Sequence, residues 1–438
     1  MLTPDQITAI APDAASLKAG RDLGTPRKWE SMGGDTEVLW GLAMGSGKQP
    51  YQTRVRLADL ASKCSCPSRK FPCKHALGLM FLATGQPAAL TQTARPAWVT
   101  EWMDAHAERV QKAETRAEEK ESKPVDEKAA AKRKAQKESR VADGIQLLQQ
   151  SILDLTREGL ASGNARDAAA WENLARRMVD CQVPGLAGAV RHVTDVVLRD
   201  PEVDHELPLE LGRLHLLLKT GARVHEHEGA LRAEILGQLG VRDAEEKKEG
   251  ELIEDRWFVA ARTIEERDRL ITSATWILGQ QTGRWGKVLR FTPAMQAIGD
   301  PWPVGASVRA GVRFQAGLSP VRVLPEGDGE VSLAGLPGPH ESGFEFLLDR
   351  FSSALSDNPF VRTLPFLILL RPGADGRSLV DATGRSLPWR ASADLAFRVE
   401  CVCAGNLTLA CGEWDGRHLR LLTLRDGDVW YPLTSQQP

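Results

Sequence analysis

The stretch CSCPSRKFPCKH, residues Cys64–His75, concentrates metal-binding side chains within twelve positions. It holds three of the chain's seven cysteines and one of its nine histidines, in the order Cys-x-Cys, six residues, Cys-x-His. Residues i and i+2 of an extended strand point to the same face, so Cys64 and Cys66 can offer two thiolates side by side. This pair is one half of a predicted metal site.

The second half is Cys73 and His75, which arrive where a helical run, HALGLMFLATG, begins. Pro67 and Pro72 fix φ in the intervening turn and lower the entropy cost of bringing the second pair back to the first. Three sulfurs and one imidazole form a closed tetrahedral set for Zn²⁺ of the structural Cys3His kind. We therefore predict one structural zinc ion, with no position left for water or substrate.

A disulfide pair or a group of buried apolar cysteines would also place several cysteines close together. Four ligand-type residues within twelve positions, flanked by bases, favour zinc over both. Three thiolates around Zn²⁺ leave one net negative charge, which the neighbouring bases and a helix N-terminus can offset. The same bases are candidate contacts for phosphate or for a partner: Lys63, Arg69, Lys70 and Lys74.

The motif CSCPS followed by CKH resembles the SWIM zinc finger, whose pattern is C-x-C, a variable spacer and C-x-H. The upstream segment Trp40–Leu57, WGLAMGSGKQPYQTRVRL, resembles the paired strands that precede the motif in bacterial members, so the resemblance covers residues 1–90. It implies a short β-hairpin that feeds a helix. The zinc ligands that it implies are Cys64, Cys66, Cys73 and His75.

The role that the resemblance implies is binding of DNA or protein. The family occurs in Mutator-like transposases, in helicase-like ATPases and in stand-alone bacterial proteins, and this chain is most similar to the stand-alone kind. Such proteins are often encoded beside a MoxR-type ATPase and a von Willebrand A-type protein. The resemblance therefore implies a protein partner of one of these two classes.

Length and composition indicate a multidomain globular protein of 438 residues, with 42% hydrophobic and 26% charged residues. The net charge of −2 means that any nucleic-acid binding must come from a local patch. The longest apolar run, Leu364–Leu370, is far shorter than the ~20 residues of a membrane span. Because the N-terminus has no secretion signal and thiols stay reduced in the cytosol, we expect a cytoplasmic protein without a membrane partner.

The predicted fold class is multidomain α+β. It combines an N-terminal zinc-binding β-hairpin and helix, a central all-α domain and a C-terminal, mainly antiparallel β domain. The boundaries follow from changes in hydrophobic periodicity and in charge. They are 1–90 for the zinc finger domain, 91–143 for a charged helical linker, 144–282 for the all-α domain and 283–438 for the β-rich domain.

Two apolar runs within this scheme are assigned by their pattern. Arg256–Leu278, RWFVAARTIEERDRLITSATWIL, is expected to be the last helix of the all-α domain, and Leu395–Ala404, LAFRVECVCA, is expected to be a strand. In the linker, Lys128–Arg140 has six bases and one acid, Glu138. We favour a solvated helix or flexible linker there, and the alternative is a basic arm on a phosphate backbone.

Other cysteines and histidines are weaker metal candidates. Cys401, Cys403 and Cys411, with His418 further on, echo the first motif, but buried free cysteines explain them better than a second metal site. The stretch His225–Glu228 lacks the HExxH spacing and is expected to be a solvated turn.

No nucleophile elbow, kinase motif set, dinucleotide glycine pattern or pair of metal carboxylates stands out, so we expect no enzyme. Three hypotheses remain: a zinc-stabilised protein-interaction module, a nucleic-acid binder using the bases around the finger, and an enzyme with its site in the C-terminal half. The near-neutral charge and the large helical middle favour the first.

Overall fold

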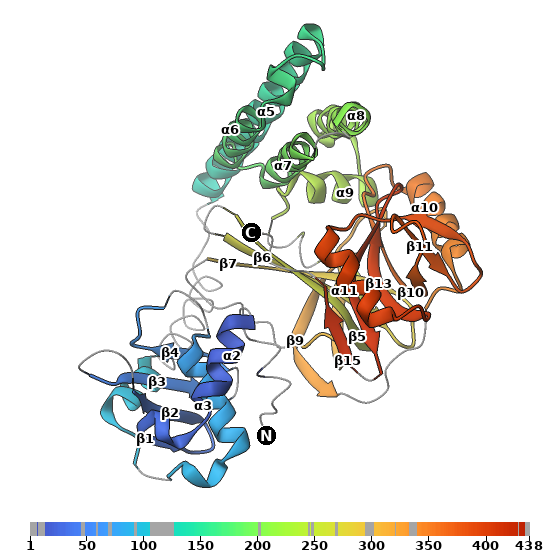
Figure 1. The fold of residues 1–438 in the computed structure, drawn as a ribbon. Helices are drawn as coiled ribbons and strands as arrows, with labels where there is room; N and C mark the ends of the chain where they lie inside the picture. Colours follow the sequence, from blue (N-terminus) through green and yellow to red (C-terminus); the bar gives the residue numbers. More distant parts are fainter. Residues whose placement is uncertain are drawn as a thin grey trace.

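The computed structural model divides the chain into an N-terminal module, a helical bundle and two β units (Figure 1). No helix among the described residues is long and apolar enough to cross a membrane. The structure describes residues 7, 14–44, 49–57, 60–68, 72–91, 94–105, 127–199, 203–243, 246, 249–267, 270–293, 302–319, 321–332, 340–427 and 429–433.

The N-terminal module is built on a four-stranded antiparallel sheet in the order β1-β2-β3-β4. The strands are β1 Trp29–Gly34, β2 Val38–Ala43, β3 Tyr51–Arg56 and β4 Ser62–Cys64. The β2–β3 hairpin has Leu39 opposite Val55, and β4 leads to helix α3, Lys74–Gly85. This confirms the expected hairpin feeding a helix.

One face of this sheet is covered by α3 and by α2, Ala14–Leu23. The two helices approach closely because glycines face each other. A Cβ on Gly20 would lie 2.6 Å from the Cβ of Leu77, and a Cβ on Gly78 would lie 2.6 Å from that of Leu23. Side chains larger than hydrogen at these two positions would push the helices apart.

The opposite face is covered by a helix at residues 97–105. Trp98 and Trp102 of this helix stack on the Arg54 guanidinium of β3, with 5.1 and 5.8 Å from its carbon to the two ring centroids. Arg95 forms ion pairs with Asp35 and Glu37 in the β1–β2 turn. The module therefore continues to residue 105, beyond the predicted boundary at 90.

The central domain is a helical bundle of α5 Glu127–Glu158, α6 Ala168–Asp180, α7 Pro184–Leu198, α8 Val203–Ala222 and α9 Gly229–Leu239. Its core is aliphatic around Trp171, whose indole N–H donates to the carbonyl of Ala165. Residues 127–143, assigned to a linker, form the first half of α5. Of the rest of that predicted linker, residues 106–126 lie outside the described part.

The segment expected as the last bundle helix instead forms two strands, β5 Leu252–Arg267 and β6 Leu270–Gly279. The prediction for Arg256–Leu278 was wrong because five consecutive residues, 257–261, are buried, and a strand buried on both faces has the same apolar run as a buried helix. The all-α domain thus ends at α9 and not at residue 282.

These strands begin a closed five-stranded barrel with the order β5-β6-β7-β9-β8. The other strands are β7 Trp285–Pro293, β8 Ser307–Phe314 and β9 Arg322–Ser332. All neighbours pair antiparallel except β7 and β9, which run parallel. The barrel interior is filled by large side chains, among them Trp257, Trp302 and Phe314.

The last unit is a six-stranded antiparallel sheet in the order β12-β11-β10-β13-β14-β15. Its strands are β10 Leu364–Pro372, β11 Ser378–Asp381, β12 Ser386–Pro388, β13 Thr408–Trp414, β14 Leu419–Asp426 and β15 Val429–Pro432. Helix α10, Phe344–Asp357, lies where a helix was expected and packs on one face of the sheet.

The predicted strand at residues 395–404 is wrong, because this segment is helix α11, Ala393–Cys403. The Ser392 hydroxyl accepts a hydrogen bond from the amide of Leu395 and caps the helix. Buried Val399 and Cys403 are four residues apart, which is helical spacing. In the sequence, Ser392 was an available N-cap signal for a helix. The alternating apolar residues after it favoured a strand instead.

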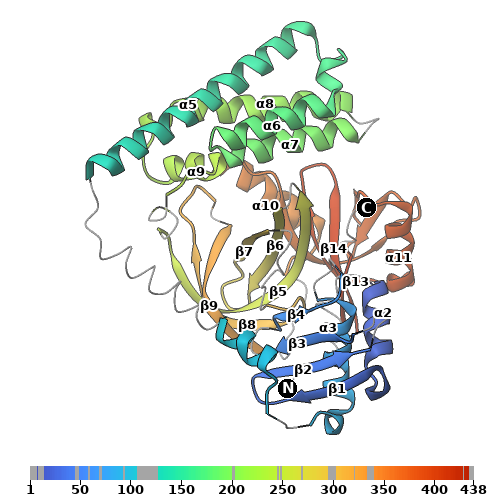
Figure 2. The same ribbon diagram turned by 90° about the vertical axis from the view of Figure 1, so that its left-hand side faces the viewer.

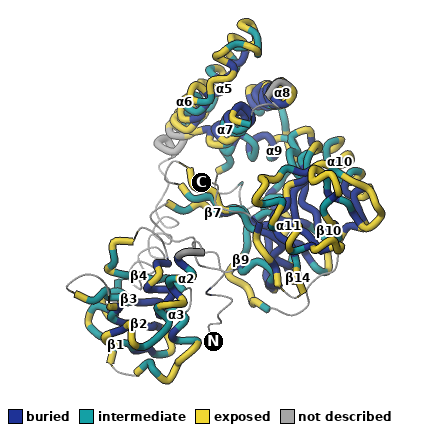
Figure 3. The backbone as a smooth tube through the Cα atoms, in the orientation of Figure 1, coloured by how far each residue is buried: buried dark blue, intermediate teal, exposed yellow. Residues whose placement is uncertain are grey.

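The barrel and the sheet share a hydrophobic core. Phe258 and Ala260 of β5 and Trp276 of β6 pack against Leu367 and Leu422 of the sheet. Figure 3 shows the buried strands of the two units adjoining one another. The two β units therefore form one frame.

The bundle is fixed to this frame through α8. Arg390, in the segment before α11, pairs with Glu206, and Arg362, just before β10, pairs with Glu210 at 2.6 Å. Both carboxylates are buried, and they lie four residues apart on one side of α8. The loop before β9 is tied to α9 in the same way, since the amide of Leu318 donates to Glu234.

Acidification should loosen this contact. Burial lowers the pKa of His192, which faces Glu210, Arg362, Arg199 and Asp195, so its stabilising contribution is present above about pH 6.5 and lost as the pH falls below that value. Burial opposes the charge of Glu210, but Arg362, His192 and Arg213 together hold its pKa below the usual range. The Glu210 contribution is therefore lost later, below about pH 4.5.

Hydrogen exchange of the α8 amides between about pH 7.5 and pH 5 would detect the first step. His192→Gln should remove the pH dependence in this window while the α6 amides serve as an internal reference. The same loss of protection in the wild type and the variant would contradict this assignment.

Candidate metal centre

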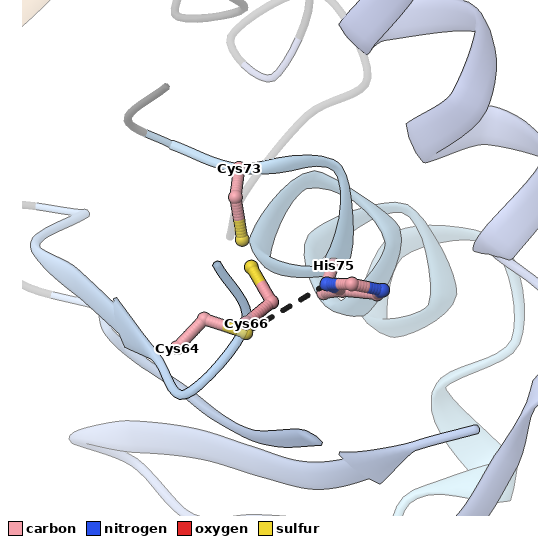
Figure 4. A group of neighbouring side chains, drawn as sticks. All are labelled: Cys64, Cys66, Cys73 and His75. Carbon is pink, nitrogen blue, oxygen red and sulfur yellow. Dashed lines mark hydrogen bonds between the residues drawn. The ribbon is translucent and has the colours of Figure 1, made fainter. Parts of the chain in front are cut away.

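The corner between β4 and α3 brings Cys64, Cys66, Cys73 and His75 together. One ligand atom from each residue can be chosen so that all four lie within 4.8 Å of one another. Figure 4 shows the three sulfurs converging beside the His75 ring. The four predicted ligands therefore form one compact group of soft donors.

The strand side of the centre is fixed by pairing with β3. Cys64 ends β4 and lies opposite Thr53, whose hydroxyl is 3.2 Å from the Cys64 sulfur. The backbone of Ser65 then bonds to Gln52, which turns the chain so that Cys66 follows in a bend rather than in the strand. Cys64 and Cys66 thus reach the same point through a turn and not through strand alternation.

The helix side supplies the two most buried ligands. Cys73 is the residue before α3 and is 3% exposed, and His75 lies in the first turn and is 4% exposed. The Nδ1 atom of His75 is 3.7 Å from the Cys64 sulfur, and its ring packs against Tyr51 with 5.0 Å between ring centroids. This packing fixes the direction of the imidazole before any metal binds.

The thiols cannot all ionise in this space without a cation. The hydrogen bond from Cys73, together with those from His75 and Thr53, lowers the pKa of Cys64 to about 3 against the effect of burial. Burial raises the pKa of Cys66, and the hydrogen bond to Cys64 together with burial raises that of Cys73. One thiolate is therefore stable alone, and three require a divalent ion among them.

The donor set fits zinc. Tetrahedral bonds of about 2.0–2.3 Å place ligand atoms ~3.5 Å apart, and the four ligand atoms here already lie within 4.8 Å of one another. Sulfur and imidazole donors are those that zinc prefers, and all four positions come from the protein. A zinc ion held here links β4 to α3 and has no open coordination position.

The bases around the centre point to solvent where they are described. Lys63 on β4 and Lys74 on α3 are exposed. The other two candidates, Arg69 and Lys70, lie outside the described residues.

The C-terminal cysteines do not form a comparable group. Cys403 on α11 packs on one face of the six-stranded sheet, and Cys411 on β13 packs on the other, while Cys401 is exposed. Within the described residues, the finger cluster is the one set of ligand side chains close enough to hold a metal ion. His225–Glu228 lies in an exposed turn between α8 and α9, as expected.

Two residues that support the ligands were not predicted from the sequence. Tyr51 and Thr53 are two residues apart on β3, so both face the ligands, and Arg54, which follows Thr53, faces the opposite helix. Strand alternation in YQTRVR was the available signal. It could not be used because the partner of that strand face was unknown from the sequence.

Comparison with known families gives two matches. Residues 51–83 match the SWIM zinc finger, and residues 136–239 match the SWIM-associated four-helix bundle domain. The first covers β3, β4 and most of α3, and the second runs from within α5 to the end of α9. Comparison with the curated proteins and with the solved structures finds no significant match.

Metal analysis should find one zinc per chain. We expect mass spectrometry of protein purified without added zinc to give one equivalent in the wild type and none in Cys73→Ser. Two equivalents with one retained in the variant would establish a second site at the C-terminal cysteines. Absence of metal in the wild type would contradict the zinc assignment.

Loss of a ligand should unfold the finger locally. Zinc binding to such sites contributes on the order of 10 kcal/mol, and this binding energy is also folding energy. Cys66→Ser or His75→Ala should therefore release zinc and remove hydrogen-exchange protection from Leu39–Ala83, with the amides of α6 and β13 unchanged. Simultaneous loss of protection in all units would show that the finger is not an independent folding unit.

Proposed function

We propose, from the premise that the chain is a SWIM zinc finger family protein with a SWIM-associated bundle, that it is a non-enzymatic adaptor that binds a protein partner. The closed Cys3His set supports this role. Zinc with four protein ligands organises structure and offers no position to a substrate. The partner surface is to be sought elsewhere on the chain.

The outer face of α8 is the observation that carries the proposal. Five exposed residues follow one another at i, i+4, i+7, i+11 and i+14, and they carry a single charge. They are His205, Leu209, Gly212, Leu216 and Lys219. Leu209 is 40% exposed and Leu216 is 39% exposed, two turns apart on the same side. Such a stripe fits the apolar groove of another protein and has nothing for phosphate except Lys219.

The other sides of α8 are already occupied. The bundle core contains Leu207, Leu211 and Leu218. On another side of the helix, Glu206 and Glu210 form ion pairs with arginines of the C-terminal frame. The outer stripe is thereby presented in a fixed direction. A rigid surface loses little conformational entropy on binding, which favours association.

The partner class follows from the family resemblance. A MoxR-type ATPase or a von Willebrand A-type protein is the partner that we propose for this stripe. A nucleic-acid role for the finger would depend on exposed Lys63 and Lys74 and on Arg69 and Lys70. Salt separates the two roles, since phosphate contacts weaken steeply with salt and apolar contacts do not.

A pull-down with the purified ATPase or von Willebrand A-type protein as bait tests the adaptor role. Binding should persist from about 50 mM to about 500 mM salt and should fall at least about tenfold in Leu209→Asp/Leu216→Asp, because two charges would be desolvated at the contact.

The matched control is Leu153→Asp/Val179→Asp, which changes two exposed apolar residues on α5 and α6 of the same bundle. It should bind like the wild type. Equal losses in both variants, or no binding of either bait to the wild type, would refute the proposed surface or the proposed partner class.

A further inference from the structure

We propose that the first half of α5 is a rigid arm that binds double-stranded DNA through its phosphate backbone. The arm is the segment 127–140, which precedes the part of α5 that lies in the bundle core. The proposal is independent of the partner of α8, because it concerns another helix and another chemistry.

The arm is strongly basic in a chain that is not. Between Lys128 and Arg140 there are six bases and one acid, whereas the whole chain has 56 bases, 58 acids and a net charge of −2. A local positive field of this kind attracts polyanions, and its strength depends on ionic strength.

The arm extends past the bundle. Figure 2 shows the beginning of α5 projecting beyond the ends of α6, α7 and α8. Lys132, Lys134 and Arg140 are exposed, and the first residue of α5 in the aliphatic core is Val141. Upstream of Val141, the side chains that the structure describes are exposed, except that of Lys137, which is half-buried.

The direction of the arm is fixed at its base. The Lys137 ammonium donates to the carbonyl of Val241 at 2.9 Å, just after α9. From Lys137 toward its C-terminus, α5 continues without interruption to Ile145 and Leu148 in the bundle core. The arm is therefore a preformed helix, and binding does not require a segment to fold.

The distribution of charge around the helix favours a groove over a flat surface. At about 100° per residue, Lys132 and Lys134 lie ~200° apart and thus on nearly opposite sides. A flat acidic protein surface could reach only one of these sides. The major groove of B-form DNA is ~12 Å wide, admits a helix of ~10–12 Å diameter and has phosphates on both walls.

The residues of the arm favour contact with the backbone of DNA rather than with its bases. No aromatic side chain occurs between Lys128 and Arg140, so base stacking has no platform. Lysines and alanines dominate the segment, and lysine acts on phosphate as a point charge. We expect binding that is insensitive to sequence and sensitive to salt.

Fluorescence anisotropy of the zinc-loaded full chain with a labelled B-form DNA duplex of arbitrary sequence tests the arm. The plot of log affinity against log salt should be linear. In Lys132→Gln/Lys134→Gln/Arg140→Gln, which leaves the Lys137 anchor in place, the slope should fall by about 3, and the affinity at low salt by at least about tenfold, because three phosphate contacts are lost. Circular dichroism should show unchanged helix content.

The matched control is Arg157→Gln/Arg176→Gln/Arg177→Gln, which removes the same charge from exposed positions elsewhere on the bundle. It should keep the wild-type slope. An equal fall in both variants would show a general charge effect and overturn the proposal, as would no binding of the wild-type chain at low salt.

Two competitors test the choice of ligand. A-form RNA duplex, whose major groove is too narrow for a helix, should compete at least about tenfold less well than DNA. Polyglutamate at equal charge concentration should compete poorly, because it has no groove. If either competitor equals DNA, the groove-bound arrangement is wrong.

Discussion

The burial of both faces of β5 is the constraint on which the larger part of the structure depends. Trp257 and Val259 fill the barrel, while Phe258 and Ala260 pack against the C-terminal sheet. Separating the two β units would expose one apolar row of this strand to water. The threonine hydroxyl of Thr423 adds a buried hydrogen bond to the carbonyl of Ala260. The barrel and the sheet are consequently a single frame on which the bundle can be oriented.

The zinc centre obeys a different constraint, which is electrostatic. Its thiols lie so close together that the ionised form of one opposes the ionisation of the others, and a divalent cation removes that opposition. The hairpin and α3 are then joined by metal bonds as well as by apolar contacts. Figure 1 shows this module set apart from the frame. The finger can therefore be stable by itself. The orientation of the bundle is determined by its contacts with the frame.

In the function that we propose, the bundle is the part that contacts a partner. One side of α8 enters the bundle core, a second holds the frame through Glu206 and Glu210, and a third remains exposed. The buried carboxylates fix the direction in which the exposed stripe and the basic start of α5 point. An apolar stripe and a basic helix on one bundle have different chemistries, so the two partners that we propose would contact separate surfaces.

The sequence alone determined the zinc ligands, the strands and helix around them, and the helical nature of residues 144–239, because these depend on spacing along a continuous segment. Tertiary structure decided the fate of Arg256–Leu278, which is strand because two separate units bury its two faces. It also placed Cys403 and Cys411 on opposite sides of one sheet, and it brought Arg362 and Arg390 to α8. Local periodicity reports which residues avoid water. Which other segment of the chain covers these residues is set by contacts between parts far apart in the sequence. Those contacts leave no signal in local spacing.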